Sequence, residues 1–182
     1  MARIIAGTHK GRRLAAVPGE GTRPTSDRVK ESLFSRLEGY NAIDDAVVVD
    51  LFAGSGALGF EALSRGAAAL EAVDTAEQAY RTLVKNAEMF GDQATIHKGQ
   101  ALRYLRAHTG PPIELLFCDP PYSLGEDELH TILAEALPQL HEAATVVIER
   151  GSRSPEPSWP AGMEPFHHKT YGTTTIWLAE PV

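Results

Sequence analysis

A short apolar run that ends in a glycine-rich turn restricts the fold of this chain most strongly. The β-branched run Val47–Val49 predicts a buried strand. Apolar residues recur at helical spacing through 57–63, which predicts a helix directly after the turn. Between them the glycines follow the spacing Gly-x-Gly-x-x-Gly, at Gly54, Gly56 and Gly59. A strand, a tight turn and a helix in this order predict a βα unit whose backbone can approach a ligand closely.

Two ligand classes fit this turn. The glycine spacing matches the dinucleotide fingerprint, and Asp74 ends the run 70–74, where an acid that binds a ribose is expected. Asp50 favours a different ligand, because a carboxylate at the end of the first strand would repel a pyrophosphate. The same carboxylate would attract a cationic amino-acid moiety, such as the methionyl part of S-adenosylmethionine. A tight turn that holds no ligand is the third interpretation.

A second apolar run, 115–118, is closed by Asp119-Pro120-Pro121-Tyr122. Adjacent prolines lack backbone donors and stiffen a loop, so in one interpretation they only stop the strand. In the other, the Asp119 carboxylate accepts one hydrogen of a planar amine and the Pro120 carbonyl accepts the second. Tyr122 then offers a flat face for an extruded base. The two motifs together predict an S-adenosylmethionine-dependent amino-methyltransferase, which works by positioning and needs no covalent nucleophile.

The rest of the chain alternates between strand and helix patterns, which predicts one α/β domain with helices on both faces of a largely parallel sheet. Strands are expected near 46–51, 70–74, 94–98, 113–119 and 144–149, and helices near 57–65, 76–90, 100–107 and 127–137. An earlier helix is expected to begin at Thr25 or Ser26 and to run to about Glu38. Thr75–Gln78 has the pattern of a capping box, and residues 167–178 that of a closing hairpin. Ligands of such sheets bind at the carboxyl ends of the strands.

Charge is unevenly distributed along the sequence. The net charge is −7, but residues 1–30 hold seven Lys and Arg against two acids, and the remainder holds ten against twenty-two. The runs 3–7 and 13–17 flank a Thr-His-Lys-Gly turn, which predicts a small β-hairpin. We therefore expect a basic arm over 1–20 and a catalytic domain over 21–182, with the arm adding little to the core. A concentrated cationic patch can bind phosphates on an acidic protein, and the candidates are Arg3, Lys10, Arg12, Arg13, Arg23 and Arg28.

Composition excludes several classes of protein. The single cysteine, Cys118, cannot form an internal disulfide and is expected to be buried in a strand. The histidines and this cysteine have no metal-ligand spacing, so no metal is expected. No secretory segment and no long apolar stretch is present, which predicts a cytoplasmic protein without a membrane span. We expect it to act as a monomer.

With these residues in view, the chain resembles the RsmD family of bacterial 16S rRNA guanine-N2 methyltransferases. The resemblance runs nearly end to end and rests on residues 3–7 with 10–14, on 22–34, on 50–56, on 119–122 and on 171–174. The block 22–34 is the most specific to the family. The resemblance implies a class I, Rossmann-like methyltransferase fold with a seven-stranded sheet whose last strand is antiparallel. It also implies that an N-terminal hairpin helps to hold 16S rRNA, free or in an assembling 30S subunit.

The resemblance also implies roles for individual residues. Those expected at the reacting amine are Asp119, Pro120, Pro121 and Tyr122. Those expected to bind S-adenosylmethionine are Asp50, Phe52, Ala53, Gly54, Gly56, Asp74, Gln100 and Ala101. Two positions depart from the family pattern, because Asp74 replaces the usual Glu and Gln100 replaces an Asp that would accept from the adenine amino group. An amide oxygen still accepts, but without charge, so weaker cofactor affinity is expected.

Other functions compete with this reading of the motifs. Asp-Pro-Pro-Tyr-like loops also serve methylation of adenine N6 in DNA or RNA and of protein glutamine amides. The chain has no room for a separate DNA-recognition domain, which disfavours a DNA substrate. A dehydrogenase that uses NAD is disfavoured by Asp50 and the Pro-Pro loop. An RNA-binding module without activity would leave Asp119–Tyr122 unexplained.

Overall fold

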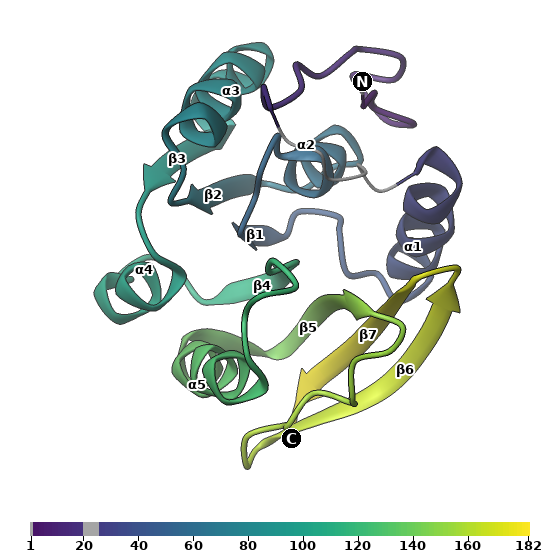
Figure 1. The fold of residues 1–182 in the computed structure, drawn as a ribbon. Helices are drawn as coiled ribbons and strands as arrows, with labels where there is room; N and C mark the ends of the chain where they lie inside the picture. The colour runs from purple at the N-terminus through teal and green to yellow at the C-terminus, as the bar shows by residue number, and fades with distance from the viewer. Residues whose placement is uncertain (1, 20–25) are drawn as a thin grey trace.

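The computed structural model describes residues 2–19 and 26–182, which form a seven-stranded sheet between two layers of helices (Figure 1). The strand order is β3-β2-β1-β4-β5-β7-β6. The strands are β1 Val47–Leu51, β2 Ala69–Asp74, β3 Ala94–Lys98, β4 Ile113–Cys118, β5 Leu140–Gly151, β6 Met163–Tyr171 and β7 Thr174–Pro181. Strands β1 to β5 pair in parallel, and the last strand, β7, is antiparallel to both β5 and β6, as expected. The order reverses between β1 and β4, which is where such sheets bind ligands.

Helices cover both faces of the sheet. They are α1 Asp27–Gly39, α2 Ala57–Ser64, α3 Glu77–Ala87, α4 Ala101–Ala107 and α5 Glu126–Ala136, with short 3-10 helices η1 Glu88–Gln93 and η2 Leu137–Gln139. One face packs against α1, α2 and α3 through a cluster that includes Phe34, Phe60 and Phe117. The other packs against α4 and α5 through a cluster that includes Leu105 and Leu133. Two buried faces explain why β1 and β4 are apolar almost throughout.

Most predicted elements are confirmed, and the differences are local. The helix expected over 76–90 ends at Ala87, because η1 follows and contains Gly91 at φ +58°. The capping box at Thr75–Gln78 is wrong: Ala76 is the N-cap of α3, and its N–H donates to Asp74 Oδ1 at 3.0 Å. Ser26 caps α1 by accepting from Val29 N; the alternative cap, Thr25, lies outside the described residues. Cys118 is buried in β4 as expected.

The N-terminal segment differs more from its expectation. The predicted hairpin is reduced to one antiparallel bridge, between Arg3 and Arg13. Ile4 N donates to Arg12 O at 2.8 Å, so the two arms of the turn do pair. Ile4 and Leu14 are fully buried in the same cluster as the α1 and α2 side chains. The segment therefore contributes to the core, contrary to the expectation that it adds little.

A buried carboxylate on α2 attaches this segment to the domain. Glu61 is fully buried and accepts from Ile5 N at 2.9 Å and Ala6 N at 3.1 Å. Its oxygens also lie 3.1 Å from Lys30 Nζ and 2.8 Å from Arg65 Nε. Both cationic side chains are buried as well, which leaves Glu61 as the shared partner of two desolvated charges. Removing one member of such a network leaves uncompensated charge in the interior.

We predict that Glu61→Gln lowers the free energy of unfolding by roughly 3–5 kcal/mol, because Lys30 and Arg65 then share a neutral partner. Urea denaturation followed by circular dichroism measures this change. Glu77→Gln is the matched control, since Glu77 forms its ion pairs with Arg81 and Lys98 at the surface, where such pairs contribute little. Equal stabilities of the two variants would contradict the prediction.

Candidate active site

Three carboxylates gather where β1, β2 and β4 end. Asp50 belongs to β1, Asp74 is the last residue of β2, and Asp119 directly follows β4. Because β1 lies between β2 and β4 and all three are parallel, their carboxyl ends share one edge of the sheet. The structure thus brings together side chains that are up to about seventy positions apart in the sequence.

The turn after β1 has a backbone that few residues can adopt. Phe52 has φ +58°, an unusual value for a bulky side chain, which marks a strained position of the kind that clusters at ligand sites. Gly56, at φ +83°, begins α2, and a Cβ there would lie 2.2 Å from Phe60 Cε2. By contrast, a Cβ on Gly54 would meet no atom within 4 Å. The turn is therefore closed on the Gly56 side by the core and open at Gly54, where a ligand could approach.

Asp50 is buried beneath this turn, and its environment depends on the third glycine. Asp50 Oδ2 accepts from Gly59 N at 3.1 Å. A Cβ on Gly59 would lie 2.7 Å from Leu70 Cδ1 and 3.2 Å from Asp50 Oδ2, so only glycine allows this approach. Burial, opposed by the bond from Gly59 and assisted by the charge of Asp74, raises the pKa of Asp50 to about 7. A nearby cation would favour the ionised carboxylate.

Asp74 holds the turn and the start of α3 together. Its Oδ2 accepts from Gly54 N at 2.9 Å, and its Oδ1 accepts from Ala76 N. Each carboxylate oxygen has a second lone pair, so both can still accept from a ligand hydroxyl. Gly99 N donates to Asp74 O at 2.9 Å, which links this strand end to the start of α4. There Gln100 is the exposed N-cap of α4 and Ala101 is buried.

The structure adds a fourth acid, Glu149, that the sequence analysis did not single out. The pairing of Cys118 with Ile148 brings Asp119, which directly follows β4, beside Glu149 of β5. Their side chains share a hydrogen bond, which two carboxyl groups can make only with a proton between them. Burial raises the pKa of Asp119, Glu149 and then Asp50 raise it further, and Arg150 opposes them. The position of Glu149 at the end of an expected strand was the available signal.

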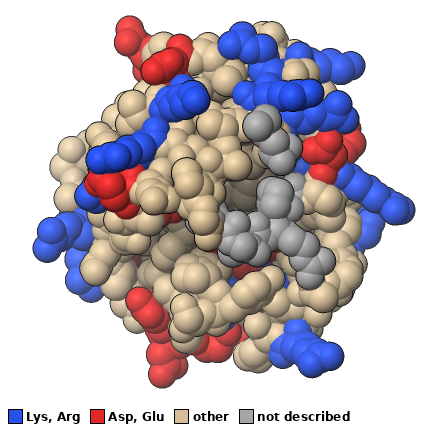
Figure 2. Space-filling view, turned by 45° about the horizontal axis from the view of Figure 1, so that its top comes forward, with Lys and Arg blue, Asp and Glu red and all other residues tan. Residues whose placement is uncertain are grey.

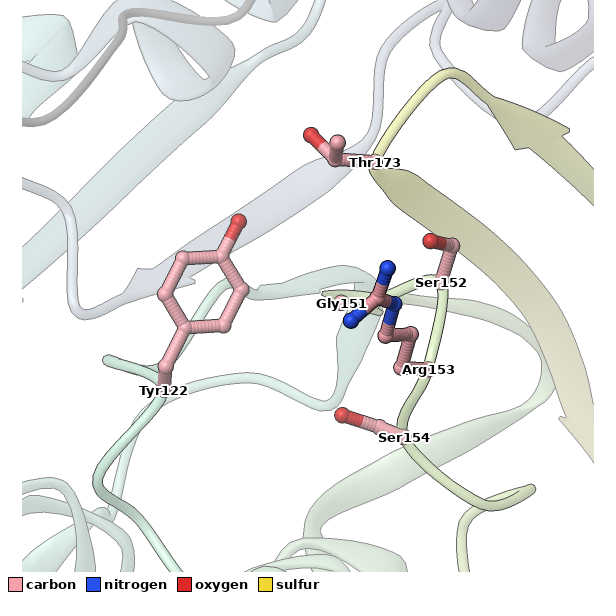
Figure 3. Close-up of a pocket in the computed structure, with 6 residues that line it drawn as sticks. All are labelled: Tyr122, Gly151, Ser152, Arg153, Ser154 and Thr173. Atoms are coloured by element: carbon pink, nitrogen blue, oxygen red, sulfur yellow. The ribbon is translucent and has the colours of Figure 1, made fainter.

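A buried arginine supports the loop after β4. Arg150 NH2 donates to Leu124 O at 3.0 Å and to Glu126 Oε1 at 2.6 Å, which ties β5 to the loop and the first turn of α5. Pro120 is buried, whereas Tyr122 is 72% exposed. In Figure 3 the Tyr122 ring stands at the edge of a cavity of about 490 Å³. The motif thus combines a loop that is held in place with an accessible aromatic face.

Those predicted RNA-binding residues that the structure describes lie on the surface. Arg3 pairs with Asp27 at 2.9 Å, and Lys10, Arg12, Arg13 and Arg28 are exposed. Arg23 lies outside the described residues. Lys and Arg side chains gather at the upper right of Figure 2, over the N-terminal segment. The molecule therefore carries exposed cations on the N-terminal segment and acids at the strand ends.

Within residues 2–19 and 26–182, no cluster of His, Cys, Asp and Glu could hold a metal ion. In the same part of the chain, no helix is long and apolar enough to cross a membrane.

Comparisons with known proteins show the family of the chain and proteins that are similar to it. The model of the family "Conserved hypothetical protein 95" matches residues 2–180. The chain is 37% identical over 177 residues to the Ribosomal RNA small subunit methyltransferase D of Escherichia coli K12, covering 97% of this chain and 88% of that protein. It is 36% identical to YlbH of Bacillus subtilis, a candidate rRNA methyltransferase, over 96% of each chain. The solved structure of yhhF from Escherichia coli, a candidate methyltransferase, superposes with a TM-score of 0.86 at 34% identity, covering 99% of this chain and 97% of that one.

We predict that Glu149→Gln lowers the pKa of Asp119, because the amide removes a neighbouring charge and donates a hydrogen bond without needing a shared proton. The carboxyl carbon shift of Asp119, followed by NMR across pH, measures it. Glu164→Gln is the control, since Glu164 is exposed on β6, away from the strand ends. An Asp119 titration identical in the wild type and Glu149→Gln would mean that the two acids do not interact.

Proposed function

The chain belongs to the Conserved hypothetical protein 95 family, and we propose that it transfers a methyl group from S-adenosylmethionine to the exocyclic N2 amine of a guanine in bacterial 16S rRNA. The convergence of Asp50, Asp74 and Asp119 at the end of three parallel strands carries this proposal. The name of the Escherichia coli relative supports the ribosomal substrate. The buried Asp50 speaks against a pyrophosphate in the same turn and thus against a dinucleotide.

The residues around the glycine turn fit S-adenosylmethionine. Asp50 would face the cationic methionyl moiety, Asp74 would accept from the ribose hydroxyls, and the amide oxygen of Gln100 would accept from the adenine amino group. The open side of Gly54 leaves room for the cofactor to lie against the backbone. The remaining contacts would come from Phe52, Ala53, Gly56 and Ala101. When bound, S-adenosylmethionine supplies an electrophilic methyl group on a sulfonium.

Asp119 and Pro120 would hold the amine that is methylated. The carboxylate accepts one hydrogen and the Pro120 carbonyl accepts the other, which fixes the nitrogen and makes its lone pair available. The exposed Tyr122 ring supports the extruded base by stacking. The nitrogen would gain the methyl group as the carbon–sulfur bond breaks and a neutral thioether leaves; it would then be positively charged, and one of its protons would pass to the Asp119–Glu149 pair. Positioning of this kind can lower the activation barrier by roughly 7–11 kcal/mol.

The exposed cations of the N-terminal segment would bind the RNA backbone. Arg3, Lys10, Arg12 and Arg13 lie on the segment that Glu61 attaches to the domain. Counterion release from phosphates makes such binding depend strongly on salt. The substrate is 16S rRNA, alone or in an assembling small subunit, and a ribosomal substrate would place the activity in the cytoplasm. We expect a monomer to suffice, since each group named here comes from one chain.

We predict that Asp119→Ala lowers kcat by at least about 100-fold, as loss of one positioned hydrogen-bonding group at a reacting centre typically does. Asp119→Asn should retain more activity, because its amide oxygen still accepts. Methylation of 16S rRNA from a strain that lacks the modification, with the product nucleoside identified by mass spectrometry, measures both. The affinity for S-adenosylmethionine should change little in either variant. Near-normal turnover of Asp119→Ala, or a product other than N2-methylguanosine, would sink the assignment.

We predict that cofactor affinity rises between pH 5.5 and 7, approaching tenfold per pH unit at the acid end. Asp50 is largely protonated below its pKa of about 7, and a cationic ligand binds better to the ionised form. The α-amino group of the ligand stays charged in this window. Calorimetry across pH tests this, with Asp50→Asn as the variant that should show weak affinity at every pH. A steep pH dependence that survives in Asp50→Asn would assign the effect to another group.

A further inference from the structure

The cavity beside Tyr122 has a lining that the methyl-transfer chemistry does not explain. It measures about 490 Å³, within the size range of small-molecule sites. Its walls come from three segments: the loop after β4, the end of β5 with the turn that follows it, and the turn between β6 and β7. The lining residues are Tyr122, Gly151, Ser152, Arg153, Ser154 and Thr173.

The chemistry of this lining is that of an anion site. Arg153 contributes a guanidinium, Ser152, Ser154 and Thr173 contribute three hydroxyls, and none of the lining residues that the structure describes carries a carboxylate. Arg153 is exposed, and within the described part of the chain it has neither an ion pair nor a hydrogen-bond partner. Figure 3 shows its guanidinium extending toward the Tyr122 ring. Arginine and hydroxyl side chains are the groups that most often contact nucleic-acid phosphates.

The turn that carries Arg153 is held in place by its backbone. Ser152 N donates to Thr173 O at 2.8 Å, and Ser154 N donates to Gly151 O at 3.0 Å. A Cβ on Gly151 would lie 3.2 Å from Tyr122 Cε1, so glycine lets the aromatic ring lie against this turn. The backbone that carries Arg153 therefore has a fixed place beside the Tyr122 ring, so that one ligand could contact both the ring and the cation.

We propose that this cavity holds a phosphate of the target nucleotide while its base lies on Tyr122, with Arg153 as the cation that positions it. The inference rests on the proposed function and adds a contact to the RNA at the reacting nucleotide itself. Extruding a base costs the free energy of unstacking it, and a phosphate contact made only by the extruded nucleotide offsets part of that cost. Arg153 thus acts on RNA binding at the site and leaves the methyl-transfer step to Asp119.

Arg153→Gln tests this role. We expect its KM for 16S rRNA to rise by roughly ten- to a hundredfold, the equivalent of one charged hydrogen-bonded contact, with kcat at saturating RNA and cofactor affinity nearly unchanged. The slope of log affinity against log salt should fall in magnitude by about 1. Arg153→Lys should recover part of the KM. Arg106→Gln is the matched control, because Arg106 is an exposed cation in the last turn of α4, paired with Glu135; its KM and slope should equal the wild type.

The outcomes separate this inference from the proposed function. An unchanged KM and salt slope in Arg153→Gln, with Asp119→Ala inactive, overturns the phosphate contact and leaves the methyltransferase proposal in place. Activity in Asp119→Ala overturns the proposed function on which both rest. Inorganic phosphate at constant ionic strength distinguishes the source of the anion. If it competes with RNA in the wild type but not in Arg153→Gln, the contact is supported; if it binds at Arg153 without affecting RNA, the cavity is a site for free anions and the inference fails.

Discussion

The charge network centred on Glu61 is the interaction on which the active site depends. Glu61 lies on α2, the helix that the glycine turn begins, and its carboxylate forms ion pairs with Lys30 of α1 and Arg65 at the end of α2. It also accepts from the backbone of Ile5 and Ala6. Arg65 extends the network to Glu31 and Glu38 on α1. Buried charges are tolerated only when paired and hydrogen-bonded, so the N-terminal segment, α1 and α2 keep one relative arrangement.

This arrangement lets one small protein combine two opposite electrostatic tasks. The strand ends concentrate Asp50, Asp74, Asp119 and Glu149, and burial together with mutual repulsion raises the pKa of Asp50 and Asp119. Such a site favours a cationic cofactor and an amine, and it would repel a polyanion. In the function that we propose, the RNA would therefore be bound outside this cluster of acids, by the exposed cations of the N-terminal segment that Glu61 attaches to the domain and by Arg153. The net charge of −7 conceals this division.

Local patterns in the sequence predicted the elements that make the site. The glycine spacing predicted the turn, and the structure gives each glycine a reason: space at Gly54, contact with Phe60 at Gly56, and the approach of Asp50 at Gly59. The predicted strand ends place Asp50, Asp74 and Asp119 on one edge of the sheet. These predictions succeed because strands buried on both faces and tight glycine turns are determined by nearby residues. The roles of the site residues stay predictions.

What the sequence determined by itself was the alternation of strands and helices, the glycine turn and the rigid Asp119–Tyr122 loop, since each depends on neighbours along the chain. The tertiary structure decided what depends on distant segments. It buried Ile4 and Leu14 in the core, although the charge distribution had suggested that these residues belong to a peripheral basic arm. It replaced the expected capping box with a bond from Ala76 to Asp74. It also placed Glu149 beside Asp119, because the register between β4 and β5 is set by packing of the whole sheet.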